Sequence, residues 1–327
     1  MNPLETTEIG STGLEVTRIG LGGAPMGGLF SDVSSENAFN ILETAYESGI
    51  KYFDTAPLYG NGKSESYYGT FLPSVPRNQF VISTKVGRVL DEIEESPNDE
   101  VFVNLPEIEV RFDYSRDGIL RSIEDSLRRL KLDKIDVALV HDPDDHYKEV
   151  LNQTLPTLYE LRSEGVITAI GAGMNQWEML ADFAREADFD CFLLAGRYTL
   201  LDHSGLQEFL PLCVSKGISV ILGGPFNSGI LASDLRFPTT YFYQNASQKI
   251  IEKAKCIKDI CDAYSVNLKA VALQFGLMHP AIVSTIPGAR TSSEVIENID
   301  MIGVDIPLGV WDDLKSENLI PLNAPTN

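Results

Sequence analysis

Residues 135–170 decide the fold, beginning Ile135-Asp-Val-Ala-Leu-Val140 and ending Val166-Ile-Thr-Ala-Ile170. These two apolar runs flank an amphipathic stretch over residues 150–162. An apolar run, a helical pattern and a second apolar run predict a strand–helix–strand unit. We expect its two strands to pair in parallel, because a crossover through a helix returns the chain to the same end of the sheet.

The same alternation extends over the rest of the chain. Apolar runs of strand length occur at residues 19–21, 52–54, 80–84, 135–140, 166–170, 191–194, 219–222 and 282–285. Helical patterns occur at residues 36–47, 119–130, 150–162, 179–185, 206–216 and 249–264. Eight such units predict a closed (β/α)8 TIM barrel of the α/β class and fit an open doubly wound sheet less well. Because no Pro- or Ser-rich linker interrupts the pattern, we expect one domain over residues 1–327.

Three segments depart from the regular alternation. Short β-prone runs at residues 6–9 and 14–17 predict an N-terminal β-hairpin. The long intervals that follow the third and seventh strands predict long βα loops at the C-terminal face of the barrel. The first of these loops contains residues 91–109, with eight acidic residues and no Lys or Arg. Its charge favours a solvated flap, with a lid over the barrel mouth as the alternative.

Composition excludes several classes of function. The chain has 26 Lys and Arg against 47 Asp and Glu, and its net charge is −21. This balance argues against binding to nucleic acids or to anionic membrane surfaces, and no apolar run approaches the roughly 20 residues of a membrane helix. The first residues show no basic segment followed by an apolar one, and the four cysteines form no C-x-x-C pair. We therefore expect a cytoplasmic protein.

Two partial motifs make other kinds of site improbable. The glycine-rich stretch over residues 20–28 has Pro25 at the third glycine position of the dinucleotide fingerprint, which argues against a Rossmann domain. His141 and His146 enclose several aspartates, but no ligand spacing typical of a metal site accompanies them. The sequence therefore predicts no metal.

Polar side chains follow three consecutive predicted strands. Asp54 ends the second strand, Tyr59 follows five residues later, Lys85 ends the third and His141 ends the fourth. A barrel brings its strand ends to one mouth, and a buried Asp or Lys is costly unless paired, so we expect Asp54 and Lys85 to pair there. The cation beside Tyr59 is expected to lower the tyrosine pKa from about 10 toward that of a usable acid/base. His141 is expected to donate a hydrogen bond to a substrate oxygen. Any one of these residues, taken alone, is explained by a polar side chain that faces solvent at a strand end. Four such residues after three successive strands are harder to explain in this way.

The second strand and its loop carry the most specific pattern. Tyr52-Phe-Asp-Thr-Ala-Pro-Leu-Tyr-Gly60, followed by Ser64-Glu65, resembles the signature of the aldo-keto reductases. The resemblance extends over residues 10–298. It implies a barrel that binds an extended nicotinamide cofactor without a Rossmann domain, and a catalytic tetrad of Asp54, Tyr59, Lys85 and His141. In this tetrad Tyr59 is the general acid/base.

The resemblance also implies a set of cofactor-binding residues. Asn175 matches the residue that holds the nicotinamide carboxamide. Tyr198 matches a tyrosine of the sixth strand, although Ala195 stands where the family often has Gln. The family's stacking tyrosine after the seventh strand is missing, and a glycine-rich backbone is expected to cover the ring and pyrophosphate instead. The implied set is Gly22, Gly23, Asn175, Tyr198, Gly223, Gly224, Pro225, Asn227, Gly229, Pro287, Gly288, Ala289, Arg290, Glu294, Glu297 and Asn298.

The loop after the eighth strand bears on the choice between NAD and NADP. Relatives that prefer NADPH typically have Lys, Ser and Arg where this chain has Gly288, Ala289 and Glu294. A carboxylate repels the 2′-phosphate and accepts hydrogen bonds from ribose hydroxyls, so we predict a preference for NAD, with NADP as the second cofactor. Arg290 is the counter-argument, because its guanidinium can pair with a phosphate.

Two shorter matches indicate a reaction. Residues 223–231 and His141-Asp142-Pro143 resemble a group that includes D-threo-aldose 1-dehydrogenases, pyridoxal 4-dehydrogenases and L-galactose dehydrogenase. This resemblance implies oxidation of the anomeric hydroxyl of an aldose (L-fucose, D-arabinose or L-galactose), or of a similar hemiacetal, to a lactone. We expect Met26, Asp142 and His146 to contact the substrate, since carboxylates at the mouth suit a polyol.

Two alternative functions remain open. The first is NADPH-dependent reduction of an aldehyde or ketone, because the same acid/base residue serves both directions. The second is a nucleotide-binding regulatory subunit, resembling the barrel proteins attached to potassium channels. The expected partner is in each case a small molecule, and the sequence carries no signature of a particular oligomeric state.

Overall fold

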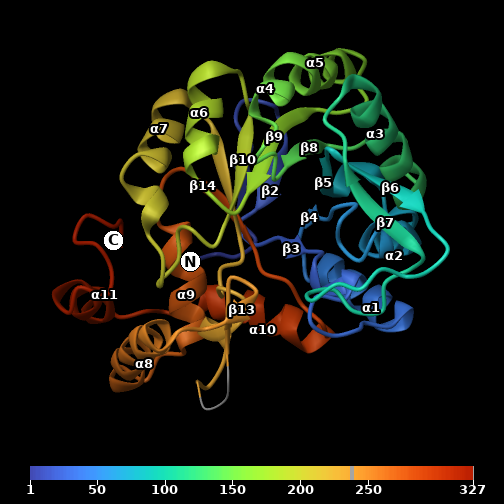
Figure 1. Ribbon diagram of the computed structural model, residues 1–327. Coiled ribbons are helices and arrows are strands. Elements are labelled where there is room, and N and C mark those ends of the chain that lie inside the picture. The colour runs from blue at the N-terminus through green and yellow to red at the C-terminus, as the bar shows by residue number, and fades with distance from the viewer. Residues whose placement is uncertain (236–238, 327) are drawn as a thin grey trace.

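The computed structural model describes residues 1–235 and 239–326. An eight-stranded parallel sheet forms its centre, surrounded by helices (Figure 1). The strand order is β14-β11-β10-β9-β8-β5-β4-β3. The strands are β3 Leu21–Gly22, β4 Tyr52–Asp54, β5 Val81–Val86, β8 Val137–His141, β9 Ala169–Met174, β10 Cys191–Ala195, β11 Ser219–Gly223 and β14 Ile282–Ile286. The Gly20 N–H donates to the Thr285 carbonyl at 2.9 Å and the Gly22 N–H to the Pro287 carbonyl at 3.1 Å, which closes the sheet as a barrel.

Helices follow the barrel strands and pack on the outside. They are α1 Ser35–Glu47, α2 Lys63–Phe71, α3 Arg116–Leu130, α4 Tyr147–Glu149, α5 Leu155–Ser163, α6 Glu178–Glu186, α7 Phe209–Lys216, α8 Gln248–Ala263, α9 Leu268–Leu277, α10 Ser292–Gly303 and α11 Leu308–Ser316. Shorter helical turns are η1 Pro25–Gly27, η2 Leu72–Ser74, η3 Arg77–Gln79, η4 Val150–Thr154, η5 Ser204–Leu206 and η6 Ile230–Ala232. In α1, the Ser34 side chain accepts a hydrogen bond from the Asn37 N–H and caps the helix. Its buried residues recur at helical spacing, so one face packs on the barrel. None of the helices in the described part of the chain is long and apolar enough to cross a membrane.

A β-hairpin closes the N-terminal end of the barrel. Strand β1 (Thr6–Glu8) pairs antiparallel with β2 (Glu15–Thr17), and Ile9 and Val16 pack into the barrel interior. The interior cluster consists of Ile9, Val16, Tyr52, Val81, Val137, Leu139, Ala169, Cys191, Leu193, Ile221, Val283 and Ile286. Apolar side chains thus fill the barrel interior at this end, and the strand ends that carry polar residues lie at the opposite, C-terminal end.

Two further hairpins lie in the long loops after the third and seventh barrel strands. They are β6 (Arg88–Glu92) with β7 (Ile108–Phe112), and β12 (Thr240–Tyr241) with β13 (Gln244–Asn245). In the first loop, the Phe30 N–H donates to the Val101 carbonyl at 2.8 Å and the Val103 N–H to the Gly28 carbonyl at 3.0 Å. Residues 101–103 therefore lie against the first βα loop as a lid does, whereas most of the acidic residues of 91–109 face solvent.

The expected (β/α)8 barrel is confirmed. Each of the eight strands lies within four residues of its predicted bounds, and the barrel, the N-terminal hairpin and both long loops are present. Helix α5 differs from its prediction at one end, because η4, a single π-helical turn, precedes it.

Candidate active site

The four polar residues predicted at the strand ends meet at the C-terminal end of the barrel. The Lys85 Nζ lies 2.9 and 3.1 Å from the two Asp54 carboxylate oxygens and donates to the Thr55 carbonyl at 2.9 Å. It also lies 4.6 Å from the centroid of the Tyr59 ring. The His141 ring stands edge-on to the Tyr59 ring, with 6.1 Å between centroids. The arrangement thus places an ion pair and an imidazole around one phenol.

The Lys85–Asp54 pair is almost completely removed from solvent. Each residue is 1% exposed, and the Ser83 hydroxyl donates to Asp54 Oδ1 at 2.7 Å. This is the pairing that the sequence predicts. A buried ion pair is tolerated only with such close geometry and additional hydrogen bonds, because desolvation of both charges is expensive. The pair therefore forms a buried polar centre at the C-terminal end of the barrel.

The pKa of Tyr59 departs from the sequence-based expectation. Burial, together with the carboxylates of Asp54 and Asp142, raises the pKa of Tyr59 well above its ordinary value, and Arg88 opposes this shift. The prediction of a lowered pKa is therefore wrong for this arrangement. Asp54 neutralises the Lys85 cation, so the desolvation of the phenolate dominates.

His141 is neutral near pH 7. Burial and the cations of Arg88 and Lys85 lower the pKa of His141 well below its ordinary value. Its Nδ1 is buried without a hydrogen-bond partner among the described residues, and its Nε2 lies 3.5 Å from Asp142 Oδ2. A neutral imidazole carries one N–H, which suits the predicted donation to a substrate oxygen.

A pocket with largely apolar walls opens beside the tetrad. Its apolar residues include Leu29, Leu58, Val101, Phe102, Met174 and Leu193. The Phe102 ring stacks on Tyr59, with 6.3 Å between centroids and 28° between planes. Arg88, Asp99 and Asp142 form a polar side. The sequence analysis found Asp142 but missed Arg88, Phe102 and Tyr243, because these lie in the long loops, where no motif marks a position.

Two of the predicted substrate residues lie elsewhere. Met26 lies in η1, within the first βα loop, and its side chain is fully buried in the apolar core. The His146 ring lies 4.7 Å from that of Tyr114, and its Nδ1 is 2.9 Å from Glu149. Neither lines the pocket, since packing of the adjacent loops turns both side chains away from it. In the described part of the chain, no group of three His, Cys, Asp or Glu side chains is placed to hold a metal ion.

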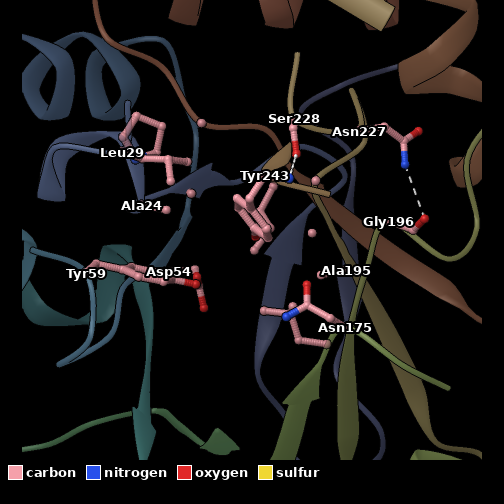
Figure 2. Close-up of a pocket in the computed structure, with 18 of the residues that line it drawn as sticks. Ala24, Leu29, Asp54, Tyr59, Asn175, Ala195, Gly196, Asn227, Ser228 and Tyr243 are labelled. Atoms are coloured by element: carbon pink, nitrogen blue, oxygen red, sulfur yellow. Dashed lines mark hydrogen bonds between the residues drawn. The ribbon is translucent and has the colours of Figure 1, made fainter. Parts of the chain in front are cut away.

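A cleft continues from the tetrad to the N-terminus of α10. Figure 2 shows its inner part, where Asn175, Ala195 and Tyr243 face Ala24 and Leu29. The predicted cofactor residues of the inner part are Gly22, Gly23, Asn175, Gly223, Gly224, Asn227 and Gly288. Those of the outer part are Gly224, Pro225, Gly229, Pro287, Gly288, Ala289, Arg290, Glu294, Glu297 and Asn298.

Tyr198 is the one predicted cofactor residue that does not line this cleft. It is 1% exposed and packs against α9, with its ring 5.0 Å from that of Phe275 and 5.5 Å from that of His279. The chain turns directly after β10 at Gly196, which has a φ of +69°. This turn carries Tyr198 out of the barrel mouth and into the helical layer.

Glycine is required at two positions of the cleft wall for different reasons. A Cβ at Gly23 would lie 2.6 Å from the Asp54 carbonyl, so glycine is needed here for the first βα loop to pack against the end of β4. Gly224 has a φ of +58°, a conformation that favours glycine. Close packing thus explains Gly23, and backbone conformation explains Gly224.

The residues of the cleft fit an extended dinucleotide. The side-chain oxygens of Asn227 and Asn298, toward opposite ends, are buried without a hydrogen-bond partner among the described residues. Lys269, which the sequence analysis missed, lies in the outer part with its Nζ 2.7 Å from Glu297. Amide acceptors and a cation along one groove are suitable partners for nicotinamide, ribose and pyrophosphate groups.

The barrel, the buried Lys–Asp pair beside a tyrosine and the long cleft define a class of barrel oxidoreductases. The chain belongs to the Aldo/keto reductase family, whose model matches residues 18–316. Members of this family use nicotinamide cofactors.

Individual relatives match over nearly their whole length. The chain is 40% identical to the pyridoxal 4-dehydrogenase of Microbacterium luteolum, over 97% of this chain and 98% of the relative. It is 36% identical to the D-threo-aldose 1-dehydrogenase of Pseudomonas sp, over 95% and 97%. The structure of the glycerol dehydrogenase AKR11B4 from Gluconobacter oxydans superimposes with a TM-score of 0.78 at 25% identity, covering 98% of each chain.

Proposed function

We propose that this protein oxidises the anomeric hydroxyl of a cyclic hemiacetal to a lactone, with NAD as the hydride acceptor. The observation that carries the proposal is the buried Lys85–Asp54 pair beside Tyr59, at the inner end of a dinucleotide-sized cleft. When bound, nicotinamide supplies the acceptor for the hydride that leaves the anomeric carbon. Tyr59 Oη takes the hydroxyl proton, and His141 donates a hydrogen bond to the same oxygen. Asn175 holds the carboxamide.

The raised pKa of Tyr59 sets the direction of the pH dependence. Oxidation requires the phenolate as base, so its rate is expected to rise with pH, whereas carbonyl reduction requires the phenol and is favoured at lower pH. This same observation supports reduction of an aldehyde or ketone as a second candidate function. The two functions share one site and differ in which protonation state of Tyr59 starts the reaction.

The pocket favours a ring-shaped substrate with one polar edge. Phe102 and the aliphatic walls suit the flat face of a ring, and Asp99 suits its polar substituents. Asp142, which we expected to bind a polyol, is already engaged by Arg88 at 3.0 Å. We therefore propose the hemiacetal of pyridoxal as a better substrate than L-fucose, D-arabinose or L-galactose.

Reduction of NAD, followed at 340 nm, tests this function with pyridoxal and the three sugars. We expect oxidation of pyridoxal to be fastest, with rates that rise from pH 7 to pH 10. The matched assay follows oxidation of NADPH with simple aromatic aldehydes. Faster reduction of these aldehydes than oxidation of any hemiacetal would contradict the proposal and support the reductase alternative.

The second prediction is a preference for NAD over NADP of at least about tenfold in kcat/KM, since like-charge contacts cost several kcal/mol. Glu294 accepts a hydrogen bond from the Arg290 backbone N–H at 2.7 Å, and the Arg290 guanidinium lies 3.8 Å from it. A 2′-phosphate would have to approach this carboxylate. Steady-state kinetics with both cofactors measures the preference.

Variants at two glutamates check this assignment. Glu294→Arg is expected to narrow the preference, because it replaces a repulsive charge by an attractive one. Glu124→Arg, on the exposed face of α3, makes the same charge change away from the cleft. It should leave the ratio of kcat/KM for NAD to that for NADP unaltered. A wild-type preference for NADP, or no response to Glu294→Arg, would show that the ribose binds elsewhere.

A further inference from the structure

Arg88 occupies a position beside the tetrad that no motif marks. It begins β6, and its guanidinium lies over the Phe112 ring at 4.7 Å from the centroid. Its Nη2 is 3.0 Å from Asp142 Oδ2, and the two side chains are 14% and 17% exposed. The ion pair is therefore mostly desolvated, which makes it stronger than a surface pair.

Asp142 is held between several groups of the site. The Tyr114 hydroxyl donates to the carbonyls of His141 and Asp142 at 2.5 and 3.1 Å, which fixes the backbone here. Oδ2 of Asp142 faces both Arg88 and the His141 Nε2, the latter at 3.5 Å. Oδ1 lies 3.5 Å from the Asn175 amide nitrogen. A single carboxylate oxygen is thus within reach of a guanidinium and of the imidazole that faces the substrate.

We propose that Arg88 is a positioning residue that binds Asp142 so that this carboxylate does not pair with His141. The imidazole then stays neutral and its N–H remains available for the substrate oxygen. This inference rests on the proposed function, in which His141 contacts that oxygen. Arg88 acts here through its neighbours rather than on the substrate.

The charges around His141 support this role. Lys85 and Arg88 both lower the pKa of His141, and Lys85 is in turn paired with Asp54. The pKa of Asp142 is raised by burial and by Asp144, and Arg88 and Lys85 oppose that shift. The other ionisable groups of the pocket are Tyr59, Asp99 and Tyr243. Without Arg88, the Asp142 carboxylate, whose Oδ2 lies 3.5 Å from His141 Nε2, would favour protonation of the imidazole.

Nitrogen NMR of histidine-labelled protein without substrate tests the proposal directly. The wild-type His141 ring should stay neutral well below the pH at which an ordinary histidine is protonated, and the signal is assigned with His141→Asn. Arg88→Met and Arg88→Gln should raise its protonation midpoint by at least about one pH unit. Arg88→Lys, which keeps a cation, should largely preserve the wild-type behaviour.

A second substitution and a control make the readout specific. Asp142→Asn added to Arg88→Met should return His141 to its neutral state, because the competing carboxylate is removed. Arg111→Met, on β7, breaks ion pairs with Asp91 and Asp113 outside the pocket and should leave the titration unchanged. An unaltered His141 titration in both Arg88→Met and Arg88→Gln would overturn the proposal.

Kinetics separates positioning from direct substrate binding. In Arg88→Met, the acid limb of kcat/KM should move to higher pH in step with the His141 titration, and Asp142→Asn should reverse the shift. A uniform loss at every pH that Asp142→Asn does not reverse would show that Arg88 contacts the substrate, which contradicts the proposal. The NMR titration does not depend on activity, so it can be read even if the wild-type protein oxidises none of the hemiacetals. Failure of the proposed function is thus distinguished from failure of the proposed role of Arg88.

Discussion

Tyr59→Phe is expected to lower kcat by about 10²–10⁴-fold, the usual contribution of a proton-transfer group, with little change in the dissociation constant of NAD. The substitution removes only the hydroxyl. The ring contacts with Phe102 and His141 are retained, so the fold and the cleft should persist. Steady-state kinetics and calorimetric titration with NAD measure the two quantities separately.

Tyr67→Phe provides the matched control for this variant. Tyr67 lies on α2, and its hydroxyl donates to the Val33 carbonyl at 3.1 Å, away from the tetrad. Its loss should leave kcat nearly unchanged. If Tyr59→Phe kept more than a tenth of the wild-type rate, another group would have to carry the proton.

Lys85→Met is expected to remove most activity and also to destabilise the protein by about 3–5 kcal/mol, the usual effect of removing one partner from a buried ion pair. It leaves the Asp54 carboxylate buried without a cation. That charge would also raise the pKa of Tyr59 further, so any residual oxidation should require higher pH. Urea unfolding and the pH profile of kcat/KM measure the two effects.

The double variant Asp54→Asn/Lys85→Met separates stability from catalysis. It removes the unpaired charge and should recover much of the lost stability without recovering activity. An alkaline limb unchanged in Lys85→Met would mean that the Lys85–Asp54 pair has no influence on the ionisation of Tyr59.

The amino-acid sequence alone determined the barrel fold and the tetrad, through the periodicity of its strands and helices and one local motif. Alternating apolar runs and amphipathic stretches predicted all eight barrel strands, because burial of strands inside a ring of helices imposes that pattern on the chain. Asp54, Lys85 and His141 were identifiable because each stands at or near the end of a strand. Strand ends of a barrel converge whatever the intervening loops do, so their side chains meet at the mouth.

Only the tertiary structure decided which loop residues join the tetrad at the barrel mouth. Met26, His146 and Tyr198 were expected at the site but are held in the core or against neighbouring elements, whereas Arg88 and Phe102 reach it from a hairpin in a long loop. Likewise, the raised pKa of Tyr59 depends on its burial and on which charges surround it. Side-chain direction in loops and desolvation arise from packing between segments distant in sequence, and no local pattern of residues encodes either one.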